Sequence, residues 1–234
     1  MPCYNEEKNI RNAVESFFAT GFVDVVLTVD NNSTDLTKSE ILKTKATYIL
    51  ETNQGYGAAI IAGLKNVNSD LVITVEPDGT FKASDVQKFL IYSEEFEVVF
   101  GSRTSTTLIW EGAYMPAWVK FGNWFCAKEI EILFSGPSLS DVGCTYKLIN
   151  RGALNKVKNE LYVEGSHFSP HFMITCIQNH LKCAEIPIHY GPRVGESKIT
   201  GGNVPRTIQL GLYMLFYIFY SRFKKKSLKG NNDG

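Results

Sequence analysis

The stretch that decides the fold is Leu71-Val72-Ile73-Thr74-Val75-Glu76-Pro77-Asp78. Residues 71–75 are rich in β-branched side chains, which is typical of a buried strand. Pro77 cannot donate to a sheet ladder, so the strand is expected to end there. Glu76 and Asp78 are two residues apart and point the same way in an extended chain. Carboxylates at the carboxyl edge of an α/β sheet suit a hard divalent cation that also holds phosphate oxygens. An ordinary Pro-Asp-Gly turn is the simpler alternative.

The flanking sequence alternates between strand and helix patterns. Because strands and helices take turns, we predict an α/β fold with a mostly parallel central sheet and helices on both faces. No strand is evident before the first helix, so the first strand is expected to be truncated. Asn5 is the expected cap of that helix. The predicted strands are 25–29, 47–50, 71–75 and 98–100, and the predicted helices are 6–20, 34–43 and 57–66.

The second half of the chain is less regular, and no linker or repeat separates it from the first. We predict helices at 118–134 and 168–179 and strands at 144–149 and 184–188. Residues 1–203 are therefore taken as one domain, and residues 204–234 as a C-terminal aromatic helix with a basic tail. The apolar run 208–220 spans roughly 20 Å as a helix, short of the roughly 30 Å hydrocarbon core of a bilayer. Aromatic residues beside a basic cluster suit a membrane interface, while a core or partner-facing helix is the alternative.

The composition allows an enzyme-sized core and gives no sign of nucleic-acid binding. Lysine plus arginine equals aspartate plus glutamate, at 24 each, and 44% of the residues are hydrophobic. The five cysteines are scattered without CxxC spacing, which favours reduced thiols and a cytoplasmic location. Because the chain opens Met-Pro-Cys-Tyr, no signal peptide is expected.

Seven short motifs occur together in a recognisable order. With them the chain resembles family 2 glycosyltransferases over residues 1 to about 200, and most closely the polyprenyl-phosphate glycosyltransferases that include dolichyl-phosphate mannose synthase. The motifs are Pro2-Cys-Tyr-Asn-Glu-Glu, Val29-Asp-Asn-Asn-Ser-Thr-Asp, Asn53-Gln-Gly-Tyr-Gly-Ala-Ala, Glu76-Pro-Asp, Gly101-Ser-Arg, Asp141-Val-Gly-Cys-Thr-Tyr-Lys and Arg193-Val-Gly-Glu-Ser-Lys.

The resemblance implies a GT-A fold and a divalent cation, Mg²⁺ or Mn²⁺, held by Glu76 and Asp78 with Thr80 as a further ligand. It also implies inverting transfer of a sugar from GDP-mannose or a UDP-sugar to a polyprenyl or dolichyl phosphate, by a peripheral protein at the cytoplasmic face of a membrane. Asp78 and Asp141 are the expected catalytic residues. Asp141 would position the acceptor, or act as a base if the acceptor is a hydroxyl. A phosphate acceptor is already anionic and needs no strong base.

The same motifs supply the candidate donor-binding residues. Local alternatives exist for each of them: helix capping for Asn5 and Glu6, a tight turn for the glycines, and a solvated charge for each cation. The candidates are Pro2, Tyr4, Asn5, Glu6, Asp30, Asn31, Asn53, Gly55, Gly57, Pro77, Asp78, Arg103, Lys147, Arg193 and Lys198.

Several other functions are compatible with parts of this pattern. A glycosyltransferase acting on a hydroxyl, in polysaccharide or glycolipid synthesis, shares every donor motif. A nucleotidyltransferase is disfavoured because its Gly-rich first loop is absent. An inactive nucleotide-sugar-binding or scaffold protein is a third possibility, because Asn31, Lys147 and His171 stand where relatives often have Asp, Arg and Glu. His167 and His171 have metal-ligand spacing on a helix, but a structural or acceptor-contacting role is favoured.

Overall fold

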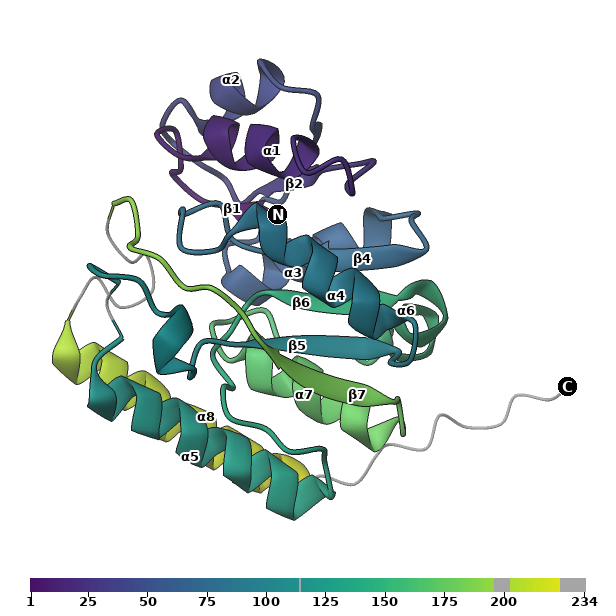
Figure 1. Cartoon of the computed structure of the whole chain (residues 1–234), viewed down its shortest axis with the longest axis vertical. Helices are drawn as coiled ribbons and strands as arrows, with labels where there is room; N and C mark the ends of the chain where they lie inside the picture. Colours follow the sequence, from purple (N-terminus) through teal and green to yellow (C-terminus); the bar gives the residue numbers. More distant parts are fainter. Residues whose placement is uncertain (114, 196–202, 224–234) are drawn as a thin grey trace, which may run out of the picture.

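The computed structural model describes residues 1–113, 115–195 and 203–223. Strands and helices alternate through the first half, and the strands fall into two sheets flanked by helices (Figure 1). The predicted α/β fold is confirmed. The strands are β1 (Pro2–Cys3), β2 (Leu27–Asp30), β3 (Thr47–Leu50), β4 (Leu71–Thr74), β5 (Val98–Ser102), β6 (Lys147–Asn150) and β7 (Cys183–Pro187). The helices are α1 (Ile10–Phe18), α2 (Thr37–Leu42), α3 (Tyr56–Asn66), α4 (Val86–Ser93), α5 (Ala117–Phe134), α6 (Arg151–Val157), α7 (Phe168–Gln178) and α8 (Val204–Phe223), with short 3₁₀ turns η1 (Ala83–Asp85) and η2 (Thr106–Leu108).

The start of the chain differs from the sequence prediction. A short strand, β1, does precede the first helix and pairs in parallel with β2. The helix begins at Ile10 rather than at residue 6, and Asn5 does not cap it. Asn5 has a positive φ of 52°, and its side chain accepts a hydrogen bond from the Thr34 backbone. Asparagine tolerates this left-handed conformation, so the residue makes a turn that ties the first loop to the loop after β2.

The first sheet has the order β1-β2-β3 and is parallel throughout. The second has the order β4-β6-β5-β7, and β6 runs antiparallel to both of its neighbours. Lys147, the first residue of β6, therefore lies opposite Thr74 near the end of β4 and Phe100 in β5. The segment entering β6 is thereby brought to the edge where β4 and β5 end.

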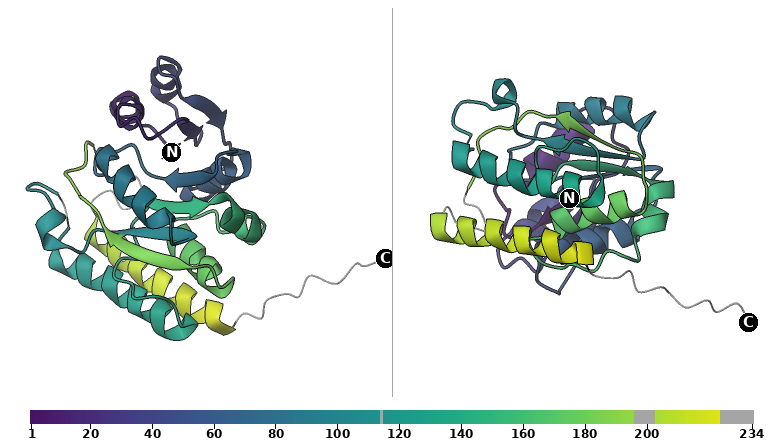
Figure 2. Two further views of the ribbon diagram at one scale, coloured as in Figure 1. Left: turned by 45° about the vertical axis from the view of Figure 1, so that its right-hand side comes forward. Right: turned by 90° about the horizontal axis from the view of Figure 1, so that it is seen from below.

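The helices bury apolar stripes against these sheets. In α1 the buried residues Ile10, Val14 and Phe17 recur at helical spacing. All five cysteines are free. Helices α5 and α8 lie side by side below the second sheet and form an outer layer (Figures 1 and 2). In the part of the chain that the structure describes, none of the helices combines the length and apolar character that a membrane span needs.

Candidate functional site

A large cavity opens at the carboxyl edge of the strands. It has a volume of about 1240 Å³ and is bordered by the loops after β1, β2 and β4, the segment entering β6, and helices α5 and α8. Eleven of the predicted site residues lie on its wall, and the structure therefore joins segments from both halves of the chain. They are Pro2, Tyr4, Glu6, Asn31, Gly55, Glu76, Pro77, Asp78, Thr80, Arg103 and Arg193.

The carboxylate pair sits just past the end of β4, as the sequence predicts. Asp78 is buried, and its Oδ1 accepts hydrogen bonds from the backbone N–H of Thr80 at 3.0 Å and the Thr80 hydroxyl at 2.6 Å. The Thr80 hydroxyl is thus engaged with the carboxylate and fixes its rotamer. In this arrangement Thr80 positions Asp78.

Arg193 reaches the same pair from the segment that follows β7. Its Nη2 lies 2.5 Å from Asp78 Oδ2 and 3.4 Å from Glu76 Oε2. The contact with Oδ2 is an ion pair without hydrogen-bond geometry. Backbone hydrogen bonds from Val194 to Asp78 and from Gly191 to Thr80 hold this segment against the loop after β4. The arginine is therefore a fixed part of the site.

The carboxylate pair fits a divalent cation. Asp78 Oδ2 is buried and makes no hydrogen bond in the described part of the chain, and its charge is balanced by the ion pair with Arg193. Burial, and then the nearby Asp78 carboxylate, raise the pKa of Glu76 to about 7. A bound cation would favour the ionised form of both carboxylates. Within the described residues no cluster of three or more His, Cys, Asp or Glu side chains is placed to hold a metal. Two carboxylates suit a cation such as Mg²⁺ that takes its other ligands from phosphates and water.

A second arginine is held by Asp141. The Asp141 carboxylate accepts hydrogen bonds from Arg103 Nε at 2.8 Å, Nη2 at 2.9 Å and the backbone N–H at 2.9 Å. Burial alone would raise the pKa of Asp141, but the Arg103 charge and its hydrogen bonds bring it below the ordinary value. Arg103 lines the cavity, whereas Asp141 is buried behind it. Asp141 therefore orients a cation that faces the cavity.

The amide of Asn31 organises the loop before α3. Its Nδ2 donates to the carbonyls of Asn53 at 2.8 Å and Glu51 at 3.2 Å, while its Oδ1 accepts from the Gly55 backbone at 2.8 Å. A carboxylate has no N–H to donate, so an aspartate here would lose two of these three bonds. These bonds give a local structural reason for an asparagine at position 31.

The two glycines before and in α3 pack against protein backbone. A Cβ on Gly57 would lie 2.1 Å from the Val163 carbonyl oxygen, and one on Gly55 would lie 2.4 Å from the Glu164 carbonyl oxygen. Gly57 does not line the cavity, although Gly55 does. Close packing between α3 and the segment before α7 explains why both positions are glycine.

Other predicted donor residues lie away from the cavity wall. Lys147 is buried, and its ammonium donates to the Cys144 carbonyl and to Ser169 Oγ. Ser169 lines the cavity, whereas Lys147 does not. Asp30 is buried and accepts hydrogen bonds from Ser33 and Tyr48. Asn5 and Asn53 belong to the supporting loops and also lie off the wall. Lys198 lies outside the described residues.

Several cavity residues were not predicted. Tyr190 packs its ring against the Arg103 guanidinium, which lies 5.3 Å from the ring centroid. Asn123 of α5 lies against Gly143, where an added Cβ would be 2.5 Å from the Asn123 Oδ1. Tyr190 follows the predicted strand 184–188 closely, and its position at a strand exit is the signal that could have identified it. Asn123 sits within a helix whose pattern is otherwise apolar, and no sequence motif marks it.

His167 and His171 attach α8 to the body of the protein. His171 accepts or donates through Nδ1 to the Tyr217 hydroxyl at 2.8 Å, and its Nε2 lies 3.1 Å from the Glu160 carbonyl oxygen. His167 packs its ring against Tyr213 and Tyr217 at centroid distances of 4.8 Å. Their contacts are structural, in agreement with the favoured interpretation of the sequence.

Comparisons with known proteins agree with this architecture. The chain is 28% identical to a dolichyl-phosphate hexose transferase of Haloferax volcanii over 203 residues, which cover 85% of this chain and 84% of that protein. It is 26% identical to a dolichyl-phosphate beta-glucosyltransferase of Trichomonas vaginalis over 245 residues, or 93% and 72% of the two chains. The fold resembles glucosyl-3-phosphoglycerate synthase of Mycobacterium tuberculosis, solved with Mn²⁺, UDP and phosphoglyceric acid, with a TM-score of 0.70 at 15% identity over 97% and 78% of the chains.

The sequence profile of the family described as Glycosyl transferase family 2 matches residues 1–158. That span contains the carboxylate pair after β4, Arg103 and Asp141. The structural similarity to glucosyl-3-phosphoglycerate synthase shows that this chain has a GT-A fold. This protein belongs to glycosyl transferase family 2.

Proposed function

We propose that the chain transfers a hexose from a nucleotide diphosphate, GDP-mannose or a UDP-sugar, to a polyprenyl phosphate with inversion of the anomeric centre. The observation that carries the proposal is one cavity in which two carboxylates and two arginines converge at a strand edge. The names of the relatives from Haloferax volcanii and Trichomonas vaginalis support a lipid-phosphate acceptor.

In the proposed reaction each charged group of the cavity has a separate task. Glu76 and Asp78 would hold Mg²⁺ or Mn²⁺, which would supply positive charge to the leaving diphosphate. Arg193 neutralises the carboxylates and contacts the donor phosphates. Arg103, fixed by Asp141 and Tyr190, presents its remaining N–H groups to the phosphate of the acceptor.

The state of Asp141 favours a phosphate acceptor over a hydroxyl. A general base works best when its pKa lies near the operating pH. The pKa of Asp141 is instead lowered, and both of its oxygens accept hydrogen bonds from Arg103. A phosphate oxygen is already deprotonated and can attack the sugar without such a base.

A donor screen with a short-chain polyprenyl phosphate tests this function. We expect transfer from one GDP- or UDP-sugar that requires Mg²⁺ or Mn²⁺ and stops in chelator. Transfer to free sugars or glycolipids, with none to the phosphate, would contradict the proposed acceptor. The absence of both transfer and metal-dependent donor hydrolysis would indicate an inactive homologue.

A further inference from the structure

Asn9 stands immediately before α1 but does not cap it. An asparagine in this position usually accepts a hydrogen bond from a backbone N–H of the first helical turn. The Asn9 side chain makes no such bond to α1, all of which the structure describes. The residue is only 9% exposed, and a buried amide is expected to have partners. Its side-chain hydrogen bonds therefore serve another purpose than starting the helix.

The Asn9 amide joins two distant parts of the chain. Its Nδ2 donates to Glu6 Oε2 at 2.7 Å and to the Val194 carbonyl oxygen at 2.9 Å. Both partners are acceptors, and only the amide nitrogen can donate, so the orientation of the side chain is fixed. Glu6 lines the cavity in the loop after β1. Val194 belongs to the segment after β7 and lies 185 residues along the chain from Asn9.

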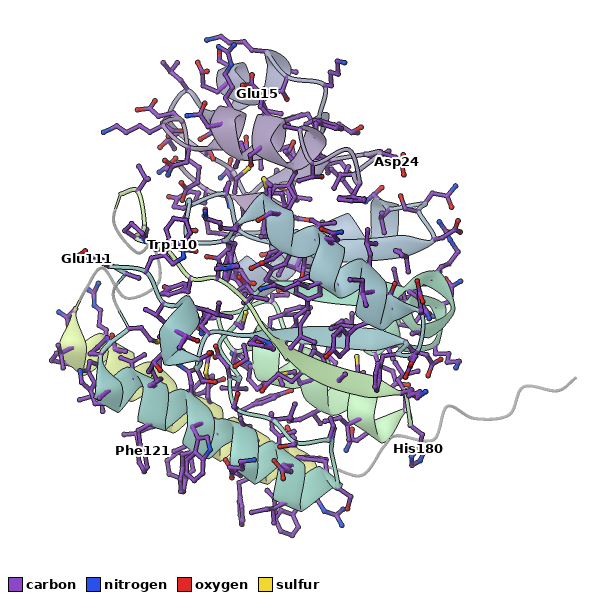
Figure 3. The ribbon with its side chains drawn as sticks, in the orientation of Figure 1. Glu15, Asp24, Trp110, Glu111, Phe121 and His180 are labelled. Carbon is purple, nitrogen blue, oxygen red and sulfur yellow. The ribbon has the colours of Figure 1, made fainter. Side chains whose placement is uncertain are left out.

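The backbone at Val194 is held from two sides. Its N–H donates to the Asp78 carbonyl at 2.9 Å, and its own carbonyl accepts from Asn9. The segment after β7 thus runs from the second sheet to the loop before α1 (Figures 1 and 3). Trp110, labelled in Figure 3, lies beside the middle of this path, where its backbone N–H donates to the Tyr190 carbonyl at 2.9 Å. Asn9 ties the far end of the segment to the first half of the chain.

Arg193 depends on this tie because it is the residue before Val194. Its Nη2 lies 2.5 Å from Asp78 Oδ2 and 3.4 Å from Glu76 Oε2. A long, flexible side chain reaches one position reliably only when its backbone is fixed, since small displacements of a positioned group reduce its effect strongly. Asn9 itself is not part of the cavity wall. It can therefore influence the charged end of the cavity only through the residues that it holds.

We infer that Asn9 is a positioning residue, which holds the backbone at Val194 so that the Arg193 guanidinium meets the carboxylate pair and the diphosphate of the donor. The inference deepens the proposed function and rests on it for the identity of the donor. The simpler alternative is that Asn9 only supports Glu6 and the loop after β1. The two roles use different hydrogen bonds of one amide, so they can be separated by experiment.

Exchanging the two side chains separates the hydrogen bonds. Asn9→Asp removes both donors and places a second carboxylate against Glu6. Combining it with Glu6→Gln restores a bond between the two side chains with its direction reversed, but the carboxylate at position 9 still cannot donate to Val194. The double variant also removes the repulsion, so it tests the tie even if Asn9→Asp alone does not fold. Asn12→Asp is the matched control, because Asn12 is an exposed residue of the same helix.

Hydrogen exchange of the Val194 amide, followed by NMR, gives a readout that does not need catalysis. We expect exchange to be at least about fivefold faster in Asn9→Asp and in the double variant, because one of the two ties at Val194 is lost. Glu6→Gln alone and Asn12→Asp should keep the wild-type rate. Exchange at the wild-type rate in the double variant would overturn the inference.

Calorimetry with GDP and with UDP, each in the presence of Mn²⁺, reports on Arg193. The double variant should bind the nucleotide at least about fivefold more weakly than Glu6→Gln alone. In an Arg193→Gln background the same exchange of side chains should weaken binding by less than about twofold, because it acts through that arginine. Binding that returns to the level of Glu6→Gln, or losses that add to that of Arg193→Gln, would overturn the inference. If Val194 exchange rises as expected but the wild type binds neither nucleotide, the tie stands and the proposed function fails.

Discussion

Replacing Asp141 by asparagine separates a positioning role from a catalytic base. In the folded protein Asp141 is 1% exposed and its side-chain partner Arg103 is 12% exposed, so the pair is well shielded from water. Removing one partner of a buried ion pair typically costs about 3–5 kcal/mol, because the other charge is left uncompensated. Asparagine keeps one acceptor oxygen, so we expect a loss near the lower end, about 3 kcal/mol. That is a large share of the roughly 5–15 kcal/mol by which such proteins are stable.

Urea unfolding measures this loss, and a double-mutant cycle assigns it to the pair. Arg103→Gln with Asp141→Asn puts two neutral amides in contact, so the double variant should be more stable than the sum of the single changes predicts. A loss below about 1 kcal/mol for Asp141→Asn would place the pair among weak surface ion pairs and refute the reasoning.

The pH dependence of stability provides an independent check. The pKa of Asp141 in the folded protein lies below the ordinary value of 3.8. Its ionised form therefore stabilises the fold above pH 3.8, and that contribution is lost as the pH falls through the lower folded-state pKa. The stability gap between wild type and Asp141→Asn should shrink in that acid range. A gap that stays constant would contradict the assignment.

The kinetic consequences distinguish the two roles of Asp141. If the residue orients Arg103, Asp141→Asn and Arg103→Gln should both raise KM for a phosphate acceptor, with effects that do not add. If it were the base for a hydroxyl acceptor, kcat alone would fall by about 10²–10⁴.

Three further predictions concern the donor side of the cavity and its supports. Asp78→Ala should abolish transfer and metal-dependent donor binding, as measured by calorimetry. The metal site would be rejected if chelator left the donor affinity unchanged in both the wild type and the variant. Asn31→Asp should destabilise the loop before α3 by about 1–3 kcal/mol, because two carbonyls lose their donor, and should raise KM for the donor; unchanged urea unfolding would contradict it. Gly57→Ala should lower the free energy of unfolding by about 1–3 kcal/mol, because its Cβ would clash with the Val163 carbonyl oxygen. Gly63→Ala in the same helix, whose Cβ would meet only a Val29 methyl at 3.2 Å, should cost clearly less in the same unfolding assay.

The sequence alone predicted most of the elements and the carboxylate end of the cavity, but not β1, α4 or α6. Strand and helix patterns are local, so most predicted elements agree with the structure to within a few residues, and 47–50 agrees completely. Glu76 and Asp78 were identifiable because a strand exit followed by carboxylates is a local signal. Arg103 and Arg193 were found through motifs, and both line the cavity.

Tertiary structure decided which of these side chains face one another. Lys147 and Asp141 lie in or before β6, whose antiparallel pairing no local pattern reveals, and the register of that strand sends Lys147 into the interior. The partners Arg103 and Asp141 are 38 residues apart, and Gly57 is required by a carbonyl at Val163. Such contacts depend on how distant segments pack, because side-chain periodicity fixes the face of an element but not the neighbour that covers it. The part of the cavity between α5 and α8 exists for the same reason, since both helices line it only once they are folded against the rest of the protein.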